Sequence, residues 1–554
     1  MKLLIIGGVA GGASAAARAR RMSEQAEIIL IDRGPDVSFA NCGLPYYIGG
    51  QIADRAKLLV TSPERLRTRY NLDVRVRSEA ESIDRTAKAV RICDLATGRV
   101  YEESYDKLIL APGAAPVRPP IPGVDLPGVF VLRNLTDMDR IKAALDQGAR
   151  QAVLVGAGFI GLELAENLAR RSVATTLVEL HDQLLHPFDR EMTTPIAETL
   201  AAHGVTVLLE ESAEGFEQGP PGEGLLVRLK SGKQLSAQMV ILGAGVRPEN
   251  NLAVAAGLEV GPRGGIRVND RLQTSDPDVY AVGDAIEVAD FVSGSPTQVP
   301  LAGPANRQGR IAATNVFGGD LRYRGTQGTA IVGVFDRTAA ITGASEKALR
   351  RANRPFRAVF VHAAHHAGYY PGAEPLTLKV LFDPQTGRIL GAQAVGGAGV
   401  DKRIDVLAVA IQAKMTVFDL EEMELTYAPQ YGSAKDPVNM AGFIAAGLLR
   451  GEHPQTSVAA VMETPPADRP FLLDVRTSTE FAAGHIPGAT NIPVDELRTR
   501  LGEVPTGRDL AVYCQVGMRG YLATRILRLA GRDASNLSGG YKTYQLFHPA
   551  GKSE

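Results

Sequence analysis

The sequence has few cysteines, and this scarcity limits the chemistry open to it. Only Cys42, Cys93 and Cys514 are present, far apart and odd in number. Such cysteines cannot form a disulfide framework, and their rarity is typical of a reducing cytosol. We therefore expect a cytoplasmic protein in which a functionally important cysteine acts as a reactive thiol. Cys93 lies in a strand-like apolar pattern, and we expect it to be structural.

The sequence also lacks a charge excess and long apolar runs. Its 60 basic and 61 acidic residues leave a formal net charge of -1, which argues against bulk binding to nucleic acid or membrane. No apolar run approaches the ~20 residues that cross a bilayer. The N-terminal run stops after Ile6, short of the roughly 7–15 residues of a signal-peptide core. It predicts the first β-strand of a soluble protein.

The chain of 554 residues is several times too long for one hydrophobic core, so three or four domains are expected. Two segments, beginning at residues 2 and 151, share the same order of apolar run, glycine turn and helical pattern. This order is typical of a βαβ nucleotide-binding unit. The sequence therefore predicts an α/β protein with two Rossmann-like dinucleotide-binding domains.

The second of these segments, VLVGAGFIGLE, contains a complete dinucleotide fingerprint. Gly156, Gly158 and Gly161 follow an apolar strand and open a helix, and Glu179 ends the next strand. The glycines let a pyrophosphate approach the helix N-terminus. Glu179 would accept a hydrogen bond from a ribose 2′-OH and repel a 2′-phosphate, so we predict NADH in preference to NADPH. The alternative is an ordinary glycine-rich turn.

The first segment departs from the fingerprint. Gly7 and Gly12 fill the outer positions, but Val9 stands where the middle glycine is expected. Asp32, twenty residues beyond Gly12, occupies the ribose position. Far downstream, TSDPDVYAVGD resembles the second FAD motif of two-dinucleotide flavoproteins, in which the final aspartate, here Asp284, binds the ribitol. Together these motifs resemble the pyridine nucleotide-disulfide oxidoreductase family over residues 1 to about 445.

Within that family, the segment SFANCGLPYYIGG departs from the dithiol members, which carry CxxxxC, because Tyr47 stands at the second cysteine position. Cys42 must therefore work alone. Single-cysteine members are either NADH oxidases or peroxidases, which cycle through cysteine sulfenic acid, or coenzyme A-disulfide and persulfide reductases, which pair with an exogenous thiol. Peroxide-handling members have a histidine at the position of Ala10. Its absence favours the second group, with an oxidase or peroxidase as the alternative.

The segments GGVAGGASAA and SFANCGLPYYIGG resemble those of coenzyme A-disulfide reductases. The resemblance implies that coenzyme A is bound around Cys42 by Arg18, Arg21, Ser38 and Asn41. The arginine pair could donate charge-assisted hydrogen bonds to phosphates, although a solvated helix face would show the same pattern. The glycine and proline after Cys42 suggest a helix start, where a thiol pKa falls from near 8.5 to roughly 3.5–7.5.

Two later segments, HHAGYYPGAEP and ELTYAPQYGSAKDP, resemble the tyrosine-bearing segments of the family's dimerisation domain. The resemblance implies a homodimer in which Tyr370, or its neighbour Tyr369, and Tyr427 reach the partner's cysteine. Their hydroxyls would donate a hydrogen bond or a proton to a leaving thiolate. Plain packing of aromatic turns is the alternative.

The C-terminal segments FLLDVRTSTEFAAGHIPGATNIP and LAVYCQVGMRGYLATRIL resemble rhodanese domains. Cys514 opens a CxxGxR loop before a helix, where backbone N–H groups and Arg519 could hold an anion or a cysteine persulfide. The tyrosine phosphatase signature HCxxGxxR differs, because Tyr513 precedes the cysteine and the arginine comes one residue early. We expect His485 to be structural rather than catalytic.

These resemblances imply the following boundaries: 1–115 and 246–325 for the FAD-binding domain, 116–245 for the NAD(H)-binding domain, 326–445 for an α+β dimerisation domain, 446–460 for a linker and 461–554 for an α/β rhodanese domain. They also imply the function. With FAD and NADH as cofactors and coenzyme A as partner thiol, Cys42 would reduce persulfides, polysulfides or coenzyme A disulfide. Cys514 would supply sulfane sulfur.

Overall fold

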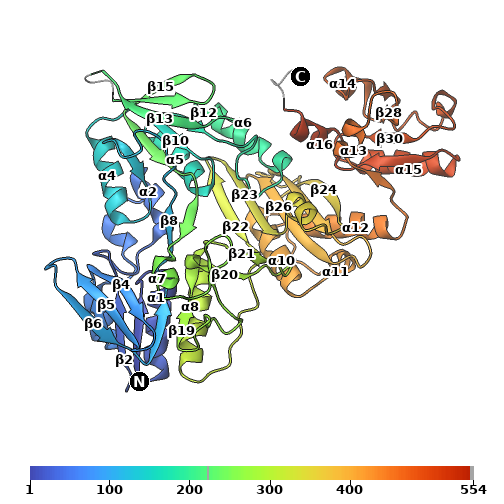
Figure 1. The fold of residues 1–554 in the computed structure, drawn as a ribbon. Helices are drawn as coiled ribbons and strands as arrows, with labels where there is room; N and C mark the ends of the chain where they lie inside the picture. Colours follow the sequence, from blue (N-terminus) through green and yellow to red (C-terminus); the bar gives the residue numbers. More distant parts are fainter. Residues whose placement is uncertain (221–223, 550–554) are drawn as a thin grey trace. The chain divides into compact units, whose positions relative to one another are not determined.

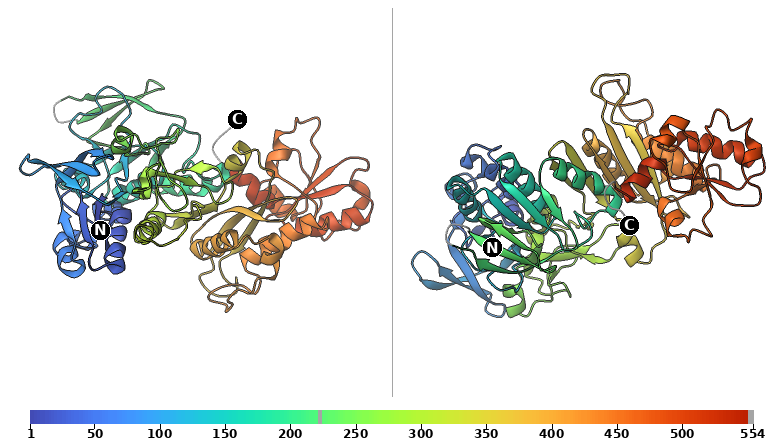
Figure 2. Two further views of the ribbon diagram at one scale, coloured as in Figure 1. Left: turned by 60° about the horizontal axis from the view of Figure 1, so that its bottom comes forward. Right: turned by 90° about the horizontal axis from the view of Figure 1, so that it is seen from above.

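The computed structural model describes residues 1–220 and 224–549. The chain divides into two compact units. The first is formed by Met1–Asp182 with His203–Gly328, and the second by Gln183–Ala202 with the chain from Thr329 onward. Within the described residues, each unit contains two five-stranded sheets, which Figures 1 and 2 show with their helices.

The first sheet of the first unit is parallel, with the strand order β19-β7-β1-β2-β3. Its strands are β1 (Lys2–Ile6), β2 (Glu27–Ile31), β3 (Asp73–Arg75), β7 (Lys107–Leu110) and β19 (Val279–Ala281). Strands β1, β2, β7 and β19 are apolar runs that are largely buried, as parallel strands covered by helices must be. The chain leaves this sheet after β7 and returns to it with β19, which is the split that the FAD motifs implied.

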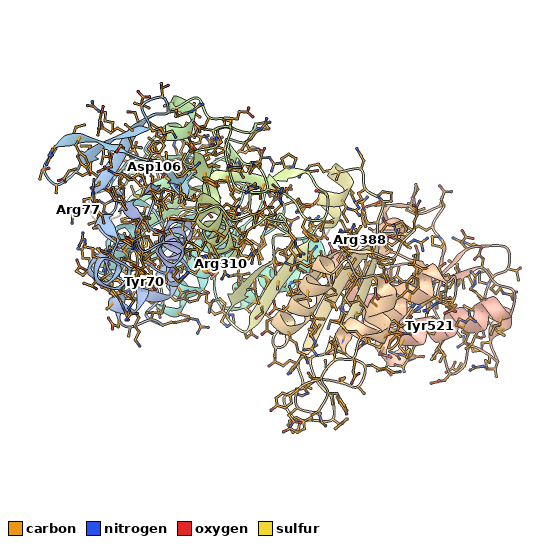
Figure 3. All side chains as sticks on the ribbon, turned by 90° about the horizontal axis from the view of Figure 1, so that it is seen from below. Tyr70, Arg77, Asp106, Arg310, Arg388 and Tyr521 are labelled. Atoms are coloured by element: carbon orange, nitrogen blue, oxygen red, sulfur yellow. The ribbon has the colours of Figure 1, made fainter. Side chains whose placement is uncertain are left out.

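Helices α1 (Ala10–Met22) and α8 (Ala302–Val316) pack against each other beside this sheet. Their close approach requires glycine, because a Cβ on Gly309 would lie 2.1 Å from the carbonyl oxygen of Gly11. Arg20 of α1 is buried and donates hydrogen bonds to the carbonyl oxygens of Tyr70 and Asn71. Tyr70 is labelled among the side chains of Figure 3. Part of the arginine-rich run of α1 is therefore structural.

The second sheet of this unit repeats the parallel arrangement with the order β12-β11-β10-β16-β9. Its strands are β9 (Val129–Val131), β10 (Gln151–Val155), β11 (Ala174–Val178), β12 (Thr206–Leu208) and β16 (Met239–Leu242), and its helices include α4 (Leu135–Asp146) and α5 (Phe159–Arg170). The order β10, glycine loop, α5, β11 is the predicted second nucleotide-binding unit. Cys93 lies on β5 (Ala89–Asp94) of a separate antiparallel sheet and is half-buried and free.

The first sheet of the second unit is antiparallel, with the order β22-β23-β26-β25-β24. Its strands are β22 (Ala330–Val334), β23 (Arg337–Gly343), β24 (Arg357–Ala364), β25 (Pro375–Phe382) and β26 (Ile389–Gly396). Helices α10 (Val400–Gln412) and α12 (Pro437–Leu449) pack against it. This is the predicted α+β domain, and α12 extends it past residue 445.

The segment 183–202 corrects the predicted NAD(H)-binding range of 116–245. Its helix α6 (Thr194–Ala202) packs against β22 and β23 of the antiparallel sheet, as Figures 1 and 2 both show. The reason is a buried ion cluster: the ammonium of Lys379 on β25 pairs with Asp189, Glu191 and Glu346. A buried ammonium needs such partners, and sequence order alone does not reveal them.

The second sheet of this unit is parallel, with the order β27-β31-β30-β28-β29. Its strands are β27 (Gln455–Thr456), β28 (Phe471–Asp474), β29 (Thr490–Asn491), β30 (Leu510–Tyr513) and β31 (Ala534–Leu537). The predicted linker 446–460 is too long, because β27 joins this sheet and α13 (Val458–Glu463) buries Val458 and Val461 in its core. Residues 550–554 of the predicted domain lie outside the described residues.

Among the residues that the structure describes, no helix is both long and apolar enough to cross a membrane. This agrees with the absence of a long apolar run in the sequence.

Candidate active sites

The first glycine loop joins β1 to α1 and forms a tight cradle. Gly7 has a φ of +100°, and a Cβ there would lie 2.0 Å from the carbonyl oxygen of Ala111. A Cβ on Gly12 would lie 1.7 Å from the carbonyl oxygen of Gly7. Helix α1 begins at Ala10 without a side-chain cap, so its first N–H groups are available to an anion. The loop keeps this geometry although Val9 replaces the middle glycine.

Two carboxylates lie at the same edge of this sheet. Asp32 follows β2 and accepts hydrogen bonds from the N–H groups of Gly8 and Gly34, both at 2.7 Å. Asp284 lies in the turn after β19. Burial raises the pKa of both carboxyl groups, and the two backbone N–H groups oppose this at Asp32. Ligands of open parallel sheets bind at the carboxyl ends of the strands, so this edge fits FAD.

The second glycine loop joins β10 to α5 in the same way. Gly156 has a φ of +107°, and a Cβ on Gly161 would lie 2.1 Å from the carbonyl oxygen of Gly156. At Gly158 a Cβ would meet nothing within 4 Å, so the middle of the loop is open. Helix α5 starts here without a side-chain cap. These residues fit the pyrophosphate of a second dinucleotide.

Glu179, at the end of β11, is buried beside this loop. Its carboxylate accepts hydrogen bonds from the N–H groups of Ala157 at 2.7 Å and His181 at 2.9 Å. These bonds hold the carboxylate at the edge where the ribose of a dinucleotide lies in this fold. A fixed negative charge there supports the predicted preference for NADH.

Cys42 lies in a short turn, η1 (Asn41–Gly43), immediately before helix α2 (Leu44–Ile48). The thiol is exposed and free, and Asn41 beside it is also exposed. Ser38 takes a left-handed φ of +49°, and its N–H donates to the carbonyl oxygen of Gly8 at 2.8 Å. The structure thus ties Ser38, Asn41 and Cys42 to the first glycine loop.

The charge around Cys42 corrects one expectation. The cysteine does precede a helix, but burial and then the carboxylates of Glu163 and Asp284 raise its pKa. A helix start lowers a thiol pKa only where nearby anions do not oppose it. α2 is five residues long, which gives it a weak terminal field. The protein groups around Cys42 therefore favour its thiol form over the thiolate.

The two arginines assigned to coenzyme A differ in their surroundings. Arg18 on α1 is half-buried and donates from Nε to the hydroxyl of Thr314 on α8 at 3.0 Å. Arg21 lies three residues further along the same helix and is exposed. Residues three apart share a helix face, so the structure brings these two arginines together. Arg18 also has a structural role between the helices.

The tyrosine segments bring Tyr369 and Tyr427 together, with their hydroxyl oxygens 3.0 Å apart. Tyr370 instead packs edge-on against His366, with ring centroids 5.7 Å apart. All three tyrosines are exposed. The sequence favours Tyr370, with Tyr369 as the alternative, as the residue that acts together with Tyr427. In the structure it is Tyr369 that pairs with Tyr427.

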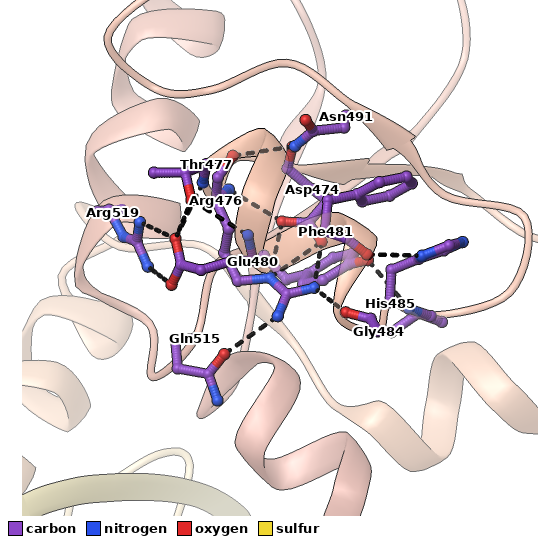
Figure 4. A network of polar contacts seen from close by, with 12 residues as sticks. Asp474, Arg476, Thr477, Glu480, Phe481, Gly484, His485, Asn491, Gln515 and Arg519 are labelled. Atoms are coloured by element: carbon purple, nitrogen blue, oxygen red, sulfur yellow. Dashed lines mark hydrogen bonds and ion pairs between the residues drawn. The ribbon is translucent and has the colours of Figure 1, made fainter.

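The rhodanese-like loop runs from Cys514, after β30, into helix α15 (Met518–Leu529). Cys514 is 1% exposed, and its Sγ accepts a hydrogen bond from the N–H of Gly517 at 3.2 Å. Arg519 forms two 2.7 Å hydrogen bonds with the carboxylate of Glu480 (Figure 4). Its guanidinium also interacts with Cys514. This pairing lowers the pKa of Glu480 to about 2. The loop places a thiol among donors, as sulfur transfer requires.

His485 is exposed and contacts Phe481 of the preceding turn. Its ring stacks on Phe481 with centroids 3.8 Å apart, and its Nδ1 contacts the carbonyl oxygen of Phe481 (Figure 4). Tyr521 on α15 makes a similar ring contact with His453, at 4.0 Å. Both histidines therefore stabilise the domain around the loop.

Comparisons with known proteins agree with this division of the chain. Residues 1–309 match the model of the pyridine nucleotide-disulphide oxidoreductase family, and residues 329–436 match its dimerisation domain. The chain belongs to this family. Residues 455–546 match the rhodanese-like domain, which confirms the second fold and places its start before the predicted residue 461.

Individual relatives cover most or all of the chain. Coenzyme A disulfide reductase of Staphylococcus haemolyticus is 36% identical over 81% of this chain and 100% of that protein. The crystal structure of reduced Bacillus anthracis CoADR-RHD matches with a TM-score of 0.95 at 48% identity, covering 99% of this chain and 98% of that one. An NAD-dependent persulfide reductase from A. fulgidus matches with a TM-score of 0.91 at 36% identity, covering 98% and 100%.

Members of this family carry out flavin-dependent redox chemistry with a pyridine nucleotide, and this chain is such an enzyme. Sequence reasoning missed several residues that build its sites. The guanidinium of Arg476 is buried and bonds Asp474, Gln515 and the carbonyl oxygen of Gly484 (Figure 4). The DVR strand end contributes to the rhodanese resemblance, but the sequence pattern alone indicates no role for the charges of Asp474 and Arg476.

The support behind the Cys514 loop was missed as well. A Cβ on Gly540 would lie 2.3 Å from the carbonyl oxygen of Cys514, and that oxygen accepts a hydrogen bond from the N–H of Tyr541 at 2.8 Å. The GG pair at 539–540 was the available signal, because both glycines have positive φ. Glu163 and Tyr46, which influence Cys42, carried no motif that would have identified them.

Proposed function

We propose that the protein is a homodimeric, cytoplasmic NADH-dependent flavoprotein that reduces persulfides, polysulfides and coenzyme A disulfide through Cys42. The supporting observation is a single exposed, free thiol beside the first glycine loop, with Tyr47 where dithiol members have a second cysteine. Such a thiol needs an exogenous partner. The relatives named above as coenzyme A disulfide and persulfide reductases suggest that this partner is coenzyme A.

FAD and NADH supply hydride chemistry when bound. The residues that would hold FAD are Gly7, Gly12, Asp32 and Asp284, and those that would hold NADH are Gly156, Gly158, Gly161 and Glu179. Both sets lie in the first unit, at the carboxyl ends of parallel strands. The protein therefore provides two dinucleotide sites of the same construction, as two-dinucleotide flavoproteins require.

The sulfur chemistry of Cys42 consists of two exchanges. The Cys42 thiolate attacks the carbon-bearing sulfur of a coenzyme A persulfide, so an S–S bond forms between Cys42 and coenzyme A and HS⁻ leaves. With coenzyme A disulfide, the same attack releases the thiolate of coenzyme A. A hydride equivalent from NADH, two electrons and one proton, then cleaves the mixed disulfide to the Cys42 thiolate and CoASH.

Coenzyme A would be held by Ser38 and Asn41 beside the thiol and by Arg18 and Arg21 on α1. The arginines present charge to its phosphates. Across the homodimer, the paired hydroxyls of Tyr369 and Tyr427 would donate to the leaving thiolate.

Cys514 would carry sulfane sulfur as a persulfide and pass it to the coenzyme A thiol. The terminal sulfur moves to CoASH, which becomes CoA–S–SH, and Cys514 returns to the thiol. Within the second unit the rhodanese domain packs on α6 and on the antiparallel sheet. The hydroxyl of Thr194 on α6 donates to the carbonyl oxygen of Leu546, and His362 on β24 bonds Thr543. This docking and the short connection between α12 and β27 favour a swinging pantetheine arm over domain motion.

Mass spectrometry of the purified, unreduced protein tests the proposal. We expect coenzyme A attached to the Cys42 peptide, removable by dithiothreitol, and NADH consumption that requires an added persulfide or disulfide. A Cys42 peptide without coenzyme A, together with NADH consumption that needs only oxygen, would instead support an oxidase acting through cysteine sulfenic acid.

A further inference from the structure

Helix α2, which directly follows Cys42, packs on helix α5 of the second glycine loop. Gly49 permits the contact, because a Cβ there would lie 1.9 Å from Oδ1 of Asn167. At the same end, Arg171 donates a hydrogen bond to the carbonyl oxygen of Ile48 at 3.2 Å. Both helices belong to the first unit. The position of α5 relative to Cys42 is therefore set by direct packing.

This packing brings an acidic residue of α5 to the Cys42 turn. Glu163 is half-buried, and its Oε1 accepts a hydrogen bond from the hydroxyl of Tyr46 at 3.3 Å. Tyr46 lies four residues after Cys42, in α2. The other acid on this part of α5, Glu166, is instead bound by Arg170 at 2.8 Å. The hydrogen-bond partner of Glu163 is thus a neutral hydroxyl, whereas that of Glu166 is a cation.

The three groups affect one another's ionisation. Burial raises the pKa of Glu163 to about 7, the charge of Glu166 adds to the rise, and the Tyr46 hydrogen bond opposes it. Burial and then Glu163 raise the pKa of Tyr46 and of Cys42. Among the charged groups, Glu163 therefore opposes the Cys42 thiolate more than Asp284 does.

The other acidic groups around this turn each have a cationic neighbour. They are Asp284 near Arg133, Asp139 bound by Arg55, Asp146 bound by Lys142 and Arg171, and Glu166 bound by Arg170. Tyr47 of α2 faces Arg55. Glu163 differs from these acids because no cation pairs with it among the described residues and because its pKa lies near neutral pH.

We propose that Glu163 is a positioning residue that holds a proton while Cys42 is a thiolate and releases it when the thiolate is consumed. This inference rests on the proposed redox role of Cys42. In the mixed disulfide, Cys42 is neutral and Glu163 carries the negative charge. When the disulfide is cleaved, Cys42 becomes a thiolate and the Glu163 carboxylate takes up one proton from solvent. Cys42 and Glu163 together therefore carry one negative charge both before and after the mixed disulfide is cleaved.

The pH profile of Cys42 alkylation tests this role without any sulfur substrate. The full-length flavoprotein is reduced with dithiothreitol, desalted and treated with iodoacetamide between pH 6 and 10, and the Cys42 peptide is quantified by mass spectrometry. Glu163→Gln removes the opposing charge while keeping the shape of the side chain. We expect it to lower the apparent pKa of Cys42 and to speed alkylation at pH 7.5 by roughly three- to tenfold.

Two further variants and a control complete the test. Glu163→Asp keeps the charge and should give a profile close to that of the unmodified protein. Tyr46→Phe removes the bond that lowers the pKa of Glu163, so it should shift the Cys42 profile in the same direction as Glu163→Gln, by less. Glu166→Gln, on the same helix but bound by Arg170, should leave the profile unchanged.

An unchanged or raised apparent pKa of Cys42 in folded, flavin-containing Glu163→Gln would overturn the inference. If that variant does not fold, an unchanged profile in Tyr46→Phe does so. Failure of the proposed function has a different signature: NADH oxidation would not depend on persulfides, while the alkylation profiles would still differ among the variants.

Discussion

The two reactive cysteines of this chain are held in opposite ways. Cys42 is exposed, and the charged groups acting on it are the carboxylates of Glu163 and Asp284. Cys514 is 1% exposed and lies among donors, with the N–H of Gly517 at its sulfur and Arg519 beside it. Both follow a strand or turn and precede a helix. The same local signal therefore produces two different thiols.

The difference matches the size of what each thiol must accept. In the proposed cycle Cys42 forms a disulfide with coenzyme A, a partner far larger than the thiol, so its surroundings must be open. Cys514 receives a single sulfur atom, which a closed ring of backbone donors can hold. Open surroundings leave the charge state of Cys42 to neighbouring side chains, whereas Cys514 is enclosed by its loop.

Replacing the two thiols separately should produce the largest contrast. Cys42→Ser should abolish NADH oxidation with every sulfur substrate, by at least about a thousandfold, because no other residue can form the mixed disulfide. Cys514→Ser should spare small diffusible persulfides and impair only sulfur presented through the rhodanese domain. Absorbance of NADH measures both. Full activity of the Cys42→Ser protein would contradict the scheme.

The donors around Cys514 can be weakened without touching Cys42. Arg519→Lys replaces a guanidinium that makes two bonds to Glu480 by a single ammonium. We expect sulfur transfer from a persulfide donor to fall by about tenfold to a hundredfold, while reduction of coenzyme A disulfide stays unchanged. Arg525→Lys on the same helix, where the arginine bonds the carbonyl oxygen of Glu452, is the matched control. Equal losses in both variants would argue against a role for the Arg519 fork.

Acid should loosen the support of the Cys514 loop before it affects the first unit. His362 on β24 bonds Thr377 and Thr543 of α16 (Gly540–Phe547), and burial, with the charge of Lys542, lowers its pKa from 6.5 to about 3. A group with a depressed pKa contributes fully above its unfolded pKa and less as pH falls. As pH falls, His362 takes up a proton at a higher pH in the undocked state than in the docked state. The docked state should therefore lose about 2 kcal/mol between pH 6.5 and 5.

Hydrogen exchange of α16 at these two pH values measures this loss. His548→Asn, at the exposed end of the same helix, should leave the pH dependence intact, since this histidine contacts the carbonyl oxygen and the ring of Tyr544 on its own helix. Exchange that does not change across this pH range would show that His362 does not control the docking.

The tyrosine pair should produce the smallest effect. Tyr369→Phe breaks the hydroxyl contact with Tyr427, whereas Tyr370→Phe removes a hydroxyl from a ring that packs on His366. We expect the first to lower kcat for coenzyme A disulfide by roughly twofold to tenfold and the second to change it less. Steady-state kinetics at saturating NADH measures the ranking, and the reverse order would restore Tyr370 as the residue facing the thiol.

Patterns that depend on neighbours in the chain were predicted well. The glycine loops at Gly7 and Gly156 and the carboxylates Asp32 and Glu179 lie at the strand ends where the fingerprints put them. Their positions follow from the geometry of one strand, one turn and one helix. The loop at Gly7 forms even with Val9 in the middle, because the outer glycines make the close contacts.

Features that depend on distant residues were missed or predicted incorrectly. Segment 183–202 leaves the NAD(H) range because Lys379, far along the chain, attracts Asp189 and Glu191. The linker is shorter than predicted because β27 pairs with β31. The composition of this polar, proline-containing segment does not reveal whether a distant strand is available to pair with it, so composition alone could not predict β27.

By itself, the sequence determined the two nucleotide loops, the single cysteine of the SFANCG turn and the loop at Cys514, since each is encoded within one short stretch. Only the tertiary structure decided which carboxylates act on Cys42 and which tyrosines meet. Charge effects and hydrogen bonds act through space, and Glu163 reaches the Cys42 turn only because α5 packs on α2.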